Sequence, residues 1–358
     1  MGLLWHFPEK YWQFGRGNVL SRNFPRFGEA APAGQFVALF IGGRNSMQTV
    51  FTVQNGNLVP QEEPGKQCWI NLVNPDTAEL EALEQRYEMP MEFLQAALDP
   101  DERARYEVED DTILILIRIP VVNHSDTSEI PYITRPLAIV IKADVLLTIC
   151  LVESPMMEDF LNEKVKNFNP ENQLRFVLQL FYRNALRFLR YLRDINTRTS
   201  AIELELQKSQ KNADLIKLLN YEKSLVFFTT SLRSNQIMMD RFKRTRFFRQ
   251  AVEDERELLE DIIIDNTQAI EMANIYTNIL SGLMDAFASV ISNNLNAVMK
   301  TLTKITIVLM LPTFVASLYG MNVKLPFQEA QSAFLLITLF CVILIIGGFI
   351  VFSNKRLF

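Results

Sequence analysis

The chain has 358 residues and a net charge of −5, and 49% of its residues are hydrophobic. This composition argues against a nucleic-acid-binding protein, because the basic stripe that phosphate backbones require is missing. The cysteines at 68, 150 and 341 are far apart, and the last lies in an apolar run. Neither a disulfide framework nor a cysteine-based zinc site is therefore indicated.

Residues 1–33 are rich in aromatic residues, glycine and proline, and we expect a loop there. Asp76 can cap a helix that continues to Tyr87, with Glu79 as its capping-box partner, and residues 90–98 predict a second helix. Short apolar runs with β-branched residues predict strands at 35–41, 49–53, 69–73, 112–119, 137–141 and 145–151. This order predicts an α/β sheet domain, covered by helices, within residues 1–165.

Residues 166–250 have helical periodicity. Apolar residues recur there at steps of three and four, with a break around Asn212, which predicts two long amphipathic helices in an antiparallel hairpin. The two apolar faces consist of Leu174, Val177, Phe181, Ala185, Phe188, Leu192 and Ile195, then Leu215, Leu218, Leu225, Phe228 and Leu232.

A third helix is predicted from about Glu253 to a turn at Gly320, and we assign its residues 251–300 to a stalk. One face of the stalk should pack on the hairpin or on neighbouring copies of the chain. That face consists of Leu258, Ile262, Ala269, Met272, Tyr276, Ile279, Leu283 and Phe287.

Two uncharged runs near the end of the chain are each long enough to cross a hydrocarbon core of about 30 Å as a helix. We predict membrane helices at 301–320 and 332–353, joined by an external loop at 321–331. Cations precede the first span and lie in the tail at 354–358, so both chain ends should be cytoplasmic. The prediction is an α+β membrane protein of the inner (plasma) membrane, with its lipid bilayer as a partner.

A polar line follows the third helix with a seven-residue period over about 69 Å and continues into the first span. Its members are Glu271, Asn274, Asn278, Asp285, Ser289, Ser292, Asn296, Met299, Thr303, Thr306, Met310, Thr313 and Ser317. A polar line in a membrane needs a wet surface to face, and two spans cannot enclose water. Several copies around a rotation axis can, so we predict a homo-oligomer whose first spans line a pore.

Most rings that such symmetry generates carry neutral oxygens, while Met299, Leu302 and Met310 form apolar constrictions that can gate by dewetting. Rings without thiolate or imidazole suit a hard, hydrated cation, and Mg²⁺ gives up its waters reluctantly. Asp285 would add a carboxylate ring that concentrates cations. With the interior about 100 mV negative, a divalent ion gains roughly 4.6 kcal/mol on entry, so uptake needs no ATP. No motif for an organic cofactor is seen in the sequence.

The turn Tyr319-Gly320-Met321-Asn322 ends the first of two C-terminal spans, and residues 292–300 read SNNLNAVMK. In this position both closely resemble the CorA family of magnesium channels. The resemblance covers the stalk, both spans and the basic tail. It implies a funnel-shaped homopentamer, inhibited by cytosolic Mg²⁺ bound between subunits.

The same resemblance implies roles for single residues. Gly320, Met321 and Asn322 would form the outer selectivity filter, and Asp261 would be a regulatory metal ligand at the subunit interface. The implied pore lining is Asn296, Met299, Leu302, Met310 and Thr313.

Two features depart from the family. Its best-known members follow the filter asparagine with an acidic Met-Pro-Glu-Leu loop, whereas residues 323–326 here read VKLP, which weakens the cation-attracting field at the mouth. The acidic regulatory partner in the family's first domain falls near Gln95 and Ala96. Asp99 and Asp101, close by, are the candidates for that regulatory site.

Other functions stay open on the residues alone. A transporter of Zn²⁺, Co²⁺ or Ni²⁺ with the same fold is the nearest alternative. A membrane-anchored scaffold or sensor would show no flux and would tolerate Asn322→Ala, since Gly-x-Asn is also common turn chemistry. Hydroxyls in a membrane helix can likewise bond to their own backbone. An enzyme is disfavoured, because the soluble part offers no nucleophile and base pair, metal cluster or phosphate loop.

Overall fold

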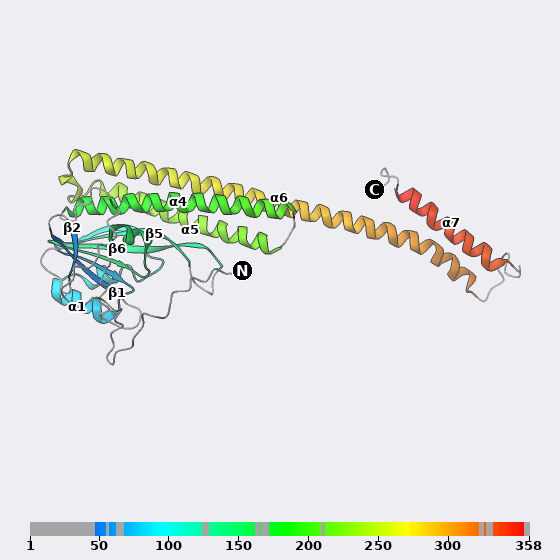
Figure 1. Cartoon of the computed structure of the whole chain (residues 1–358), viewed down its shortest axis with the longest axis horizontal. Helices are drawn as coiled ribbons and strands as arrows, with labels where there is room; N and C mark the ends of the chain where they lie inside the picture. Colours follow the sequence, from blue (N-terminus) through cyan, green and yellow to red (C-terminus); the bar gives the residue numbers. More distant parts are fainter. Residues whose placement is uncertain are drawn as a thin grey trace, which may run out of the picture. The chain divides into compact units, whose positions relative to one another are not determined.

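The computed structural model describes residues 47–54, 57–61, 68–123, 129–161, 165, 172–208, 212–321, 326 and 332–353. The chain divides into two compact units, Met1–Leu280 and Ser281–Phe358. Helix α6, Glu253–Tyr319, is continuous and contributes residues to both units (Figure 1). The loop predicted at 1–33 and the strand predicted at 35–41 lie outside the described residues.

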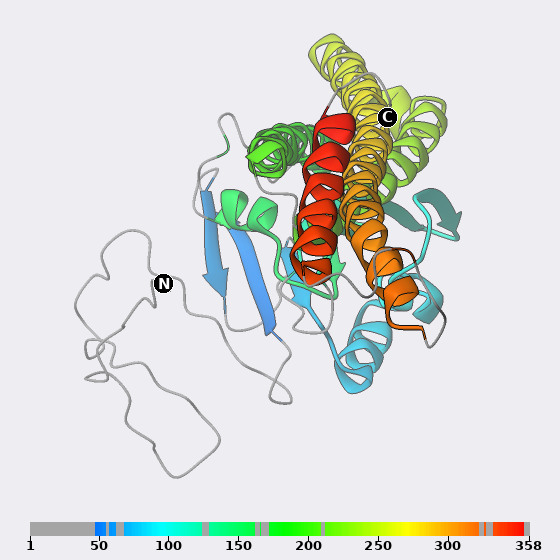
Figure 2. The same ribbon diagram turned by 90° about the vertical axis from the view of Figure 1, so that its right-hand side faces the viewer.

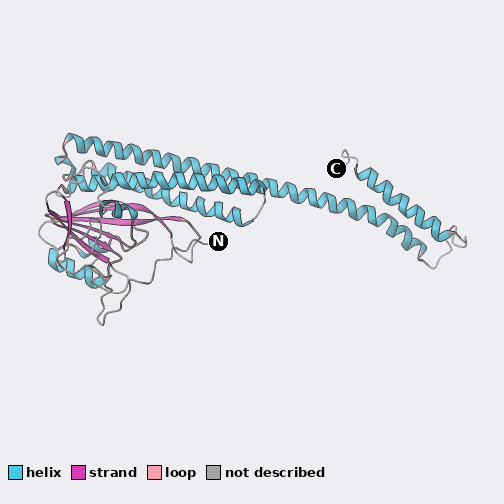
Figure 3. Ribbon diagram, in the orientation of Figure 1, coloured by secondary structure: helices cyan, strands magenta, loops and turns pink. Residues whose placement is uncertain are grey.

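The first unit is built on a mixed sheet, whose seven described strands have the order β2-β1-β3-β7-β6-β5-β4 (Figures 1 and 3). The strands are β1 Met47–Gln54, β2 Asn57–Gln61, β3 Cys68–Val73, β4 Arg105–Glu109, β5 Thr112–Val122, β6 Tyr132–Lys142 and β7 Val145–Cys150. Neighbouring strands are antiparallel except for β3 and β7. The predictions missed β2 and β4, which are the two edge strands. An edge strand is covered on fewer sides, so its sequence needs no long apolar run.

Alternation along the strands divides the core between the two faces of the sheet. In β5, Leu114 and Leu116 pack with α1 and α2, whereas Ile115 and Ile117 pack with the longer helices. The first face is covered by α1 Thr77–Tyr87 and α2 Met91–Gln95. The second is covered by α3 Pro155–Leu161, α4 Gln173–Lys208, α5 Asn212–Phe242 and the start of α6. The predicted fold class, an α/β sheet domain with long helices and two C-terminal apolar helices, is confirmed.

The predicted cap of α1 is also confirmed. The Glu79 N–H donates to Asp76 Oδ1 at 2.8 Å, and the Asp76 N–H donates to Glu79 Oε2 at 2.9 Å. These bonds satisfy two backbone donors that a helix start leaves without partners. A sequence signature of four residues was enough here because the interaction is local.

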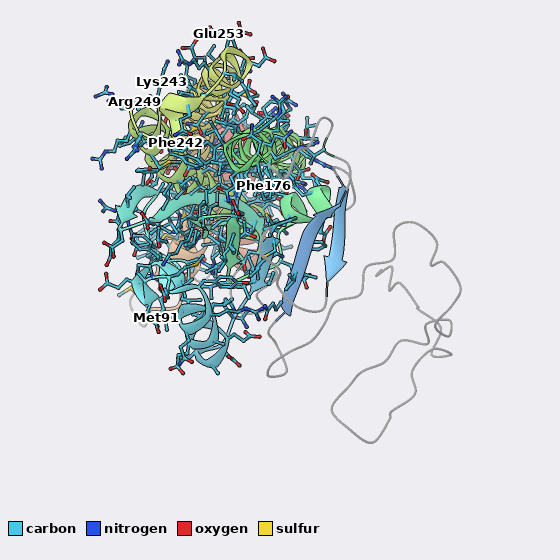
Figure 4. All side chains as sticks on the ribbon, turned by 90° about the vertical axis from the view of Figure 1, so that its left-hand side faces the viewer. Met91, Phe176, Phe242, Lys243, Arg249 and Glu253 are labelled. Carbon is cyan, nitrogen blue, oxygen red and sulfur yellow. The ribbon has the colours of Figure 1, made fainter. Side chains whose placement is uncertain are left out.

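Aromatic rings join the helices to the sheet. Phe176 of α4 meets the Trp69 ring of β3 edge-on at 5.0 Å, and Phe242 at the end of α5 meets Phe181 at 5.4 Å. Both labelled phenylalanines belong to the core on the second face of the sheet (Figure 4). The hairpin of α4 and α5, which three residues connect, therefore packs on the sheet as one layer.

The predicted apolar face of α6 is confirmed in part. Ile262, Ala269 and Phe287 are buried, whereas Ile279 is 51% exposed and Leu258 is only half-buried. The residues that α6 buries in the first unit are Glu255, Leu259, Ile262, Asn266, Ala269, Ala273 and Leu280. Asn266 lies in the middle of this face, and an apolar pattern search passes over a polar residue.

Candidate functional site

The second unit contains the end of α6 and α7, Ala333–Ser353, which lie side by side (Figure 2). Among the described residues, these two helices are long and apolar enough to cross a membrane. Only 6% of the apolar window of α6 and 0% of that of α7 is buried, so neither helix resembles the core helix of a soluble domain.

Helix α7 packs on one face of α6. Val308 of α6 is 8% exposed, and a Cβ added at Gly348 of α7 would lie 3.2 Å from its Cγ2. Further along, the Cys341 thiol of α7 donates to the Pro312 carbonyl at 3.9 Å. The glycine at 348 thus lets the two helices approach closely, as small residues do between membrane helices.

The predicted polar line lies on the other side of α6 from this contact. Successive helix residues are about 100° apart, which places Thr306 and Met310 roughly opposite Val308. Met299, Leu302 and Met310 are 52%, 56% and 64% exposed. The oxygen-bearing members are exposed as well, namely Asp285, Asn296, Thr303, Thr306, Thr313 and Ser317. In the first unit, by contrast, Asn274 is half-buried and accepts a bond from the Arg233 guanidinium at 3.4 Å.

The threonine hydroxyls of this face donate to their own helix. Thr303, Thr306 and Thr313 each donate to the carbonyl four residues earlier, at 2.8, 2.9 and 2.8 Å. A hydroxyl has one proton and two lone pairs, so the lone pairs stay free to accept bonds from outside the helix. The threonines therefore bond to their own backbone, and their hydroxyl oxygens can still accept hydrogen bonds.

The end of α6 is a tight turn. The Gly320 N–H donates to the Ala316 carbonyl at 3.0 Å, and the Met321 N–H donates to the Leu318 carbonyl at 3.2 Å. Tyr319 Oη donates to the Pro326 carbonyl at 3.2 Å. Asn322, the predicted filter residue, lies outside the described residues. The C-terminal end of a helix carries roughly half a negative charge, which favours a cation at this end of α6.

The predicted regulatory acids are exposed. Asp99 and Asp101 lie together, because the Asp101 N–H donates to Asp99 Oδ1 at 2.9 Å. The buried Arg118 holds the same loop through the Pro100 carbonyl at 2.6 Å. Burial lowers the pKa of Arg118, and the nearby Asp101 and Asp99 carboxylates oppose that shift. Asp261 is exposed on α6, and no group of three or more His, Cys, Asp or Glu side chains that could hold a metal ion occurs among the described residues.

Asp265 was missed by the sequence analysis. It lies one helical turn after Asp261, and burial raises its pKa, with a further contribution from the Asp261 charge. The spacing of four residues between two aspartates was the available signal.

The fold identifies the class of protein: a membrane protein with an α/β domain, a helical hairpin and two C-terminal spans. The family model described as "CorA-like Mg2+ transporter protein" matches residues 65–356. The chain therefore belongs to the CorA family.

Curated relatives and solved structures agree with this assignment. The "Cobalt/magnesium transport protein CorA" of Methanocaldococcus jannaschii is 27% identical over 282 residues, which are 77% of this chain and 87% of the relative. The "Magnesium transport protein CorA" of Campylobacter jejuni is 23% identical over 312 residues, covering 84% of this chain and 94% of the relative. The complete structure of the Methanocaldococcus jannaschii CorA magnesium transporter matches with a TM-score of 0.71 at 24% identity, over 87% of this chain and 98% of the other.

Replacing Gly348 by leucine should separate α7 from α6, because a side chain there meets the stiff, β-branched Val308. We expect Gly348→Leu to lower the thermal midpoint of the purified protein in detergent. Gly347→Leu is the matched control, since nothing lies within 4 Å of a Cβ at Gly347. Equal midpoints for the two variants would contradict the packing described for α7.

The Asp265 carboxyl should make stability depend on pH. Its pKa is raised in the folded state, while an unfolded aspartate titrates at about 3.9. The folded state therefore binds more protons, and stability rises as pH falls from neutral through the folded-state pKa. Asp265→Asn should stabilise the protein at neutral pH, with an advantage that shrinks toward about pH 4.

Thermal unfolding of both proteins between pH 4 and pH 8 measures this difference. Glu271→Gln, an exposed change on the same helix, serves as the control. An advantage of Asp265→Asn that stays constant with pH would show that the carboxyl is not responsible.

Proposed function

We propose that the protein is a homo-oligomeric channel for divalent cations, through which Mg²⁺ enters the cell passively along the membrane potential. The observation that carries the proposal is the exposed polar face of α6, on the side away from α7. In hydrocarbon this face would leave polar groups without partners. Around a symmetry axis it would instead line a water-filled path, with α7 on the lipid side.

A pentamer is the assembly we propose, with both chain ends and the sheet domain in the cytoplasm. The family assignment and the solved structure of a complete CorA transporter support it. Pore-facing residues would be Asn296, Met299, Leu302, Thr303, Thr306, Met310, Thr313 and Ser317, with Asp285 at the inner end.

The hydroxyl geometry supports transport of a hydrated ion. Because the threonine protons are donated to backbone carbonyls, the lone pairs accept hydrogen bonds from water. The first-shell waters of Mg²⁺ are strong donors, and the ion releases them reluctantly. Such rings would hold the ion with its waters in place, while Met299 and Met310 narrow the path.

Selectivity is assigned to the turn formed by Gly320, Met321 and Asn322. The negative end of the α6 dipole and a ring of Asn322 amide oxygens would together favour a hydrated cation at the outer mouth. Cobalt is the second candidate ion, since the name of the Methanocaldococcus jannaschii relative includes it. Zn²⁺ or Ni²⁺ transport, and a scaffold without transport, are outcomes that the flux measurement below separates.

Regulation by intracellular Mg²⁺ is assigned to exposed carboxylates on α6, of which Asp261 is the regulatory candidate. Asp265, one turn away, prefers its proton because of burial and the Asp261 charge, and a bound divalent ion would relieve that repulsion. Asp99 and Asp101 are the candidates in the sheet domain. Arg118 lies beside that loop, so its positive charge opposes a divalent ion there.

Asn322→Ala should abolish Mg²⁺ uptake while the oligomer stays intact. The measurement is influx into proteoliposomes that contain a magnesium-sensitive dye, with an inside-negative potential and low internal Mg²⁺. Asn196→Ala, an exposed change on α4 far from the turn, is the control and should retain flux. Absence of flux in the unmodified protein, for Mg²⁺, Co²⁺, Ni²⁺ and Zn²⁺ alike, would favour the scaffold.

Thr313→Cys should place a reactive thiol in the water path. In a Cys341→Ser background, a membrane-impermeant thiol reagent should slow flux through Thr313→Cys. Val315→Cys, which replaces a half-buried residue two turns along the helix from Val308, should be unaffected. Equal block of both variants would contradict the assignment of this face to the pore.

A further inference from the structure

The first unit contains a small cavity where α4, α5 and α6 meet the sheet. Its volume is about 10 Å³, and its lining combines apolar side chains with three asparagines. The asparagine cluster consists of Asn184 of α4, Asn235 of α5 and Asn266 of α6, which are 5%, 2% and 2% exposed. Three amides around one cavity are unusual in a core that is otherwise apolar.

Two members of the cluster are held by the backbone of β5. Asn235 Oδ1 accepts from the Arg118 N–H at 2.8 Å, and Asn235 Nδ2 donates to the Arg118 carbonyl at 2.8 Å. Asn184 Nδ2 donates to the same carbonyl at 3.0 Å. Asn184 Oδ1, however, is buried without a hydrogen-bond partner. A buried acceptor in that condition destabilises the fold.

The third member, Asn266, donates both of its amide hydrogens to α5. Its Nδ2 bonds to the Leu232 carbonyl at 3.1 Å and to Gln236 Oε1 at 2.8 Å. The remaining polar atom of the Asn266 side chain is Oδ1. Asn184 and Asn235 each have one amide hydrogen beyond the bonds described above. The cavity lining therefore offers acceptors and donors for a small ligand.

We propose that this cavity is a binding site for one ordered water molecule that joins α4 to α6. The water donates to Asn184 Oδ1 and to Asn266 Oδ1, and it accepts from a remaining amide hydrogen of the cluster. The volume fits one water, and buried waters typically make about three hydrogen bonds. A metal ion is disfavoured because no carboxylate lines the cavity.

The water has a consequence for α6. Asn266 is a polar residue within the buried face of that helix, and a buried asparagine is known to fix the register of packed helices. Sliding α6 along α4 and α5 would break the two bonds of Asn266 and the water contact together. This site would therefore set the register of α6 on the hairpin.

The test is a high-resolution map of the full-length protein in lipid nanodiscs. We expect a density peak within hydrogen-bond distance of both Asn184 Oδ1 and Asn266 Oδ1. An empty cavity, in a map that resolves other buried waters, would overturn the proposal. This measurement uses the unmodified protein and does not require that any variant folds.

A second measurement uses Asn184→Leu, which keeps the size of the side chain but removes both the acceptor and the Nδ2 bond to the Arg118 carbonyl. If a water is present, the change removes one of its hydrogen-bond acceptors and weakens its bond to Asn266 Oδ1. We therefore expect the thermal midpoint to fall by about 2–4 °C. Asn196→Leu, an exposed change on the same helix, should leave the midpoint unchanged. An equal or higher midpoint would refute the water, because it would show that the Asn184 amide makes no net contribution at the cavity.

Discussion

A polar face on a helix that crosses hydrocarbon must find water or another polar surface, and this requirement governs the second unit. The face of α6 that carries Thr306, Met310 and Thr313 is exposed, while α7 occupies the side of Val308. With the other side taken, α7 cannot shield the polar face. In the function proposed above, association with further copies of the chain would satisfy the polar groups and create a path for ions. The oligomer is part of that proposed function.

In the first unit, the same helix is part of a hydrophobic core. There α6 buries an apolar face against α4 and α5, and the alternating strands of the sheet divide the core into two layers. Most polar groups in this core have partners, as the bonds of Arg118 and Asn235 illustrate. One exception is Asn184 Oδ1, at the point where α6 crosses the hairpin. A buried polar site at such a crossing gives specificity of register that apolar packing alone does not provide.

The candidate site is a prediction from the sequence, which was possible because its signals are local or periodic. The polar line, the two spans and the Gly-Met-Asn turn are each visible as a pattern in the chain. The apolar face of α6 was only partly visible, since Leu258 and Leu259 are equally apolar and only packing decides which one is buried. Asp265 was missed for a related reason. Its pKa depends on how much of the carboxyl the neighbouring elements cover, and no pattern of residues states that.

The sequence by itself determined the fold class, the capping of α1, the hairpin and the presence of two membrane helices. These follow from short-range rules: hydrogen bonding at a helix start, a 3.6-residue period and the length of an uncharged run. Only the tertiary structure decided the edge strands, the contact between Gly348 and Val308, and the asparagine cluster around the cavity. Those features join residues far apart in the chain, and the free energy of each depends on neighbours that a linear pattern does not contain.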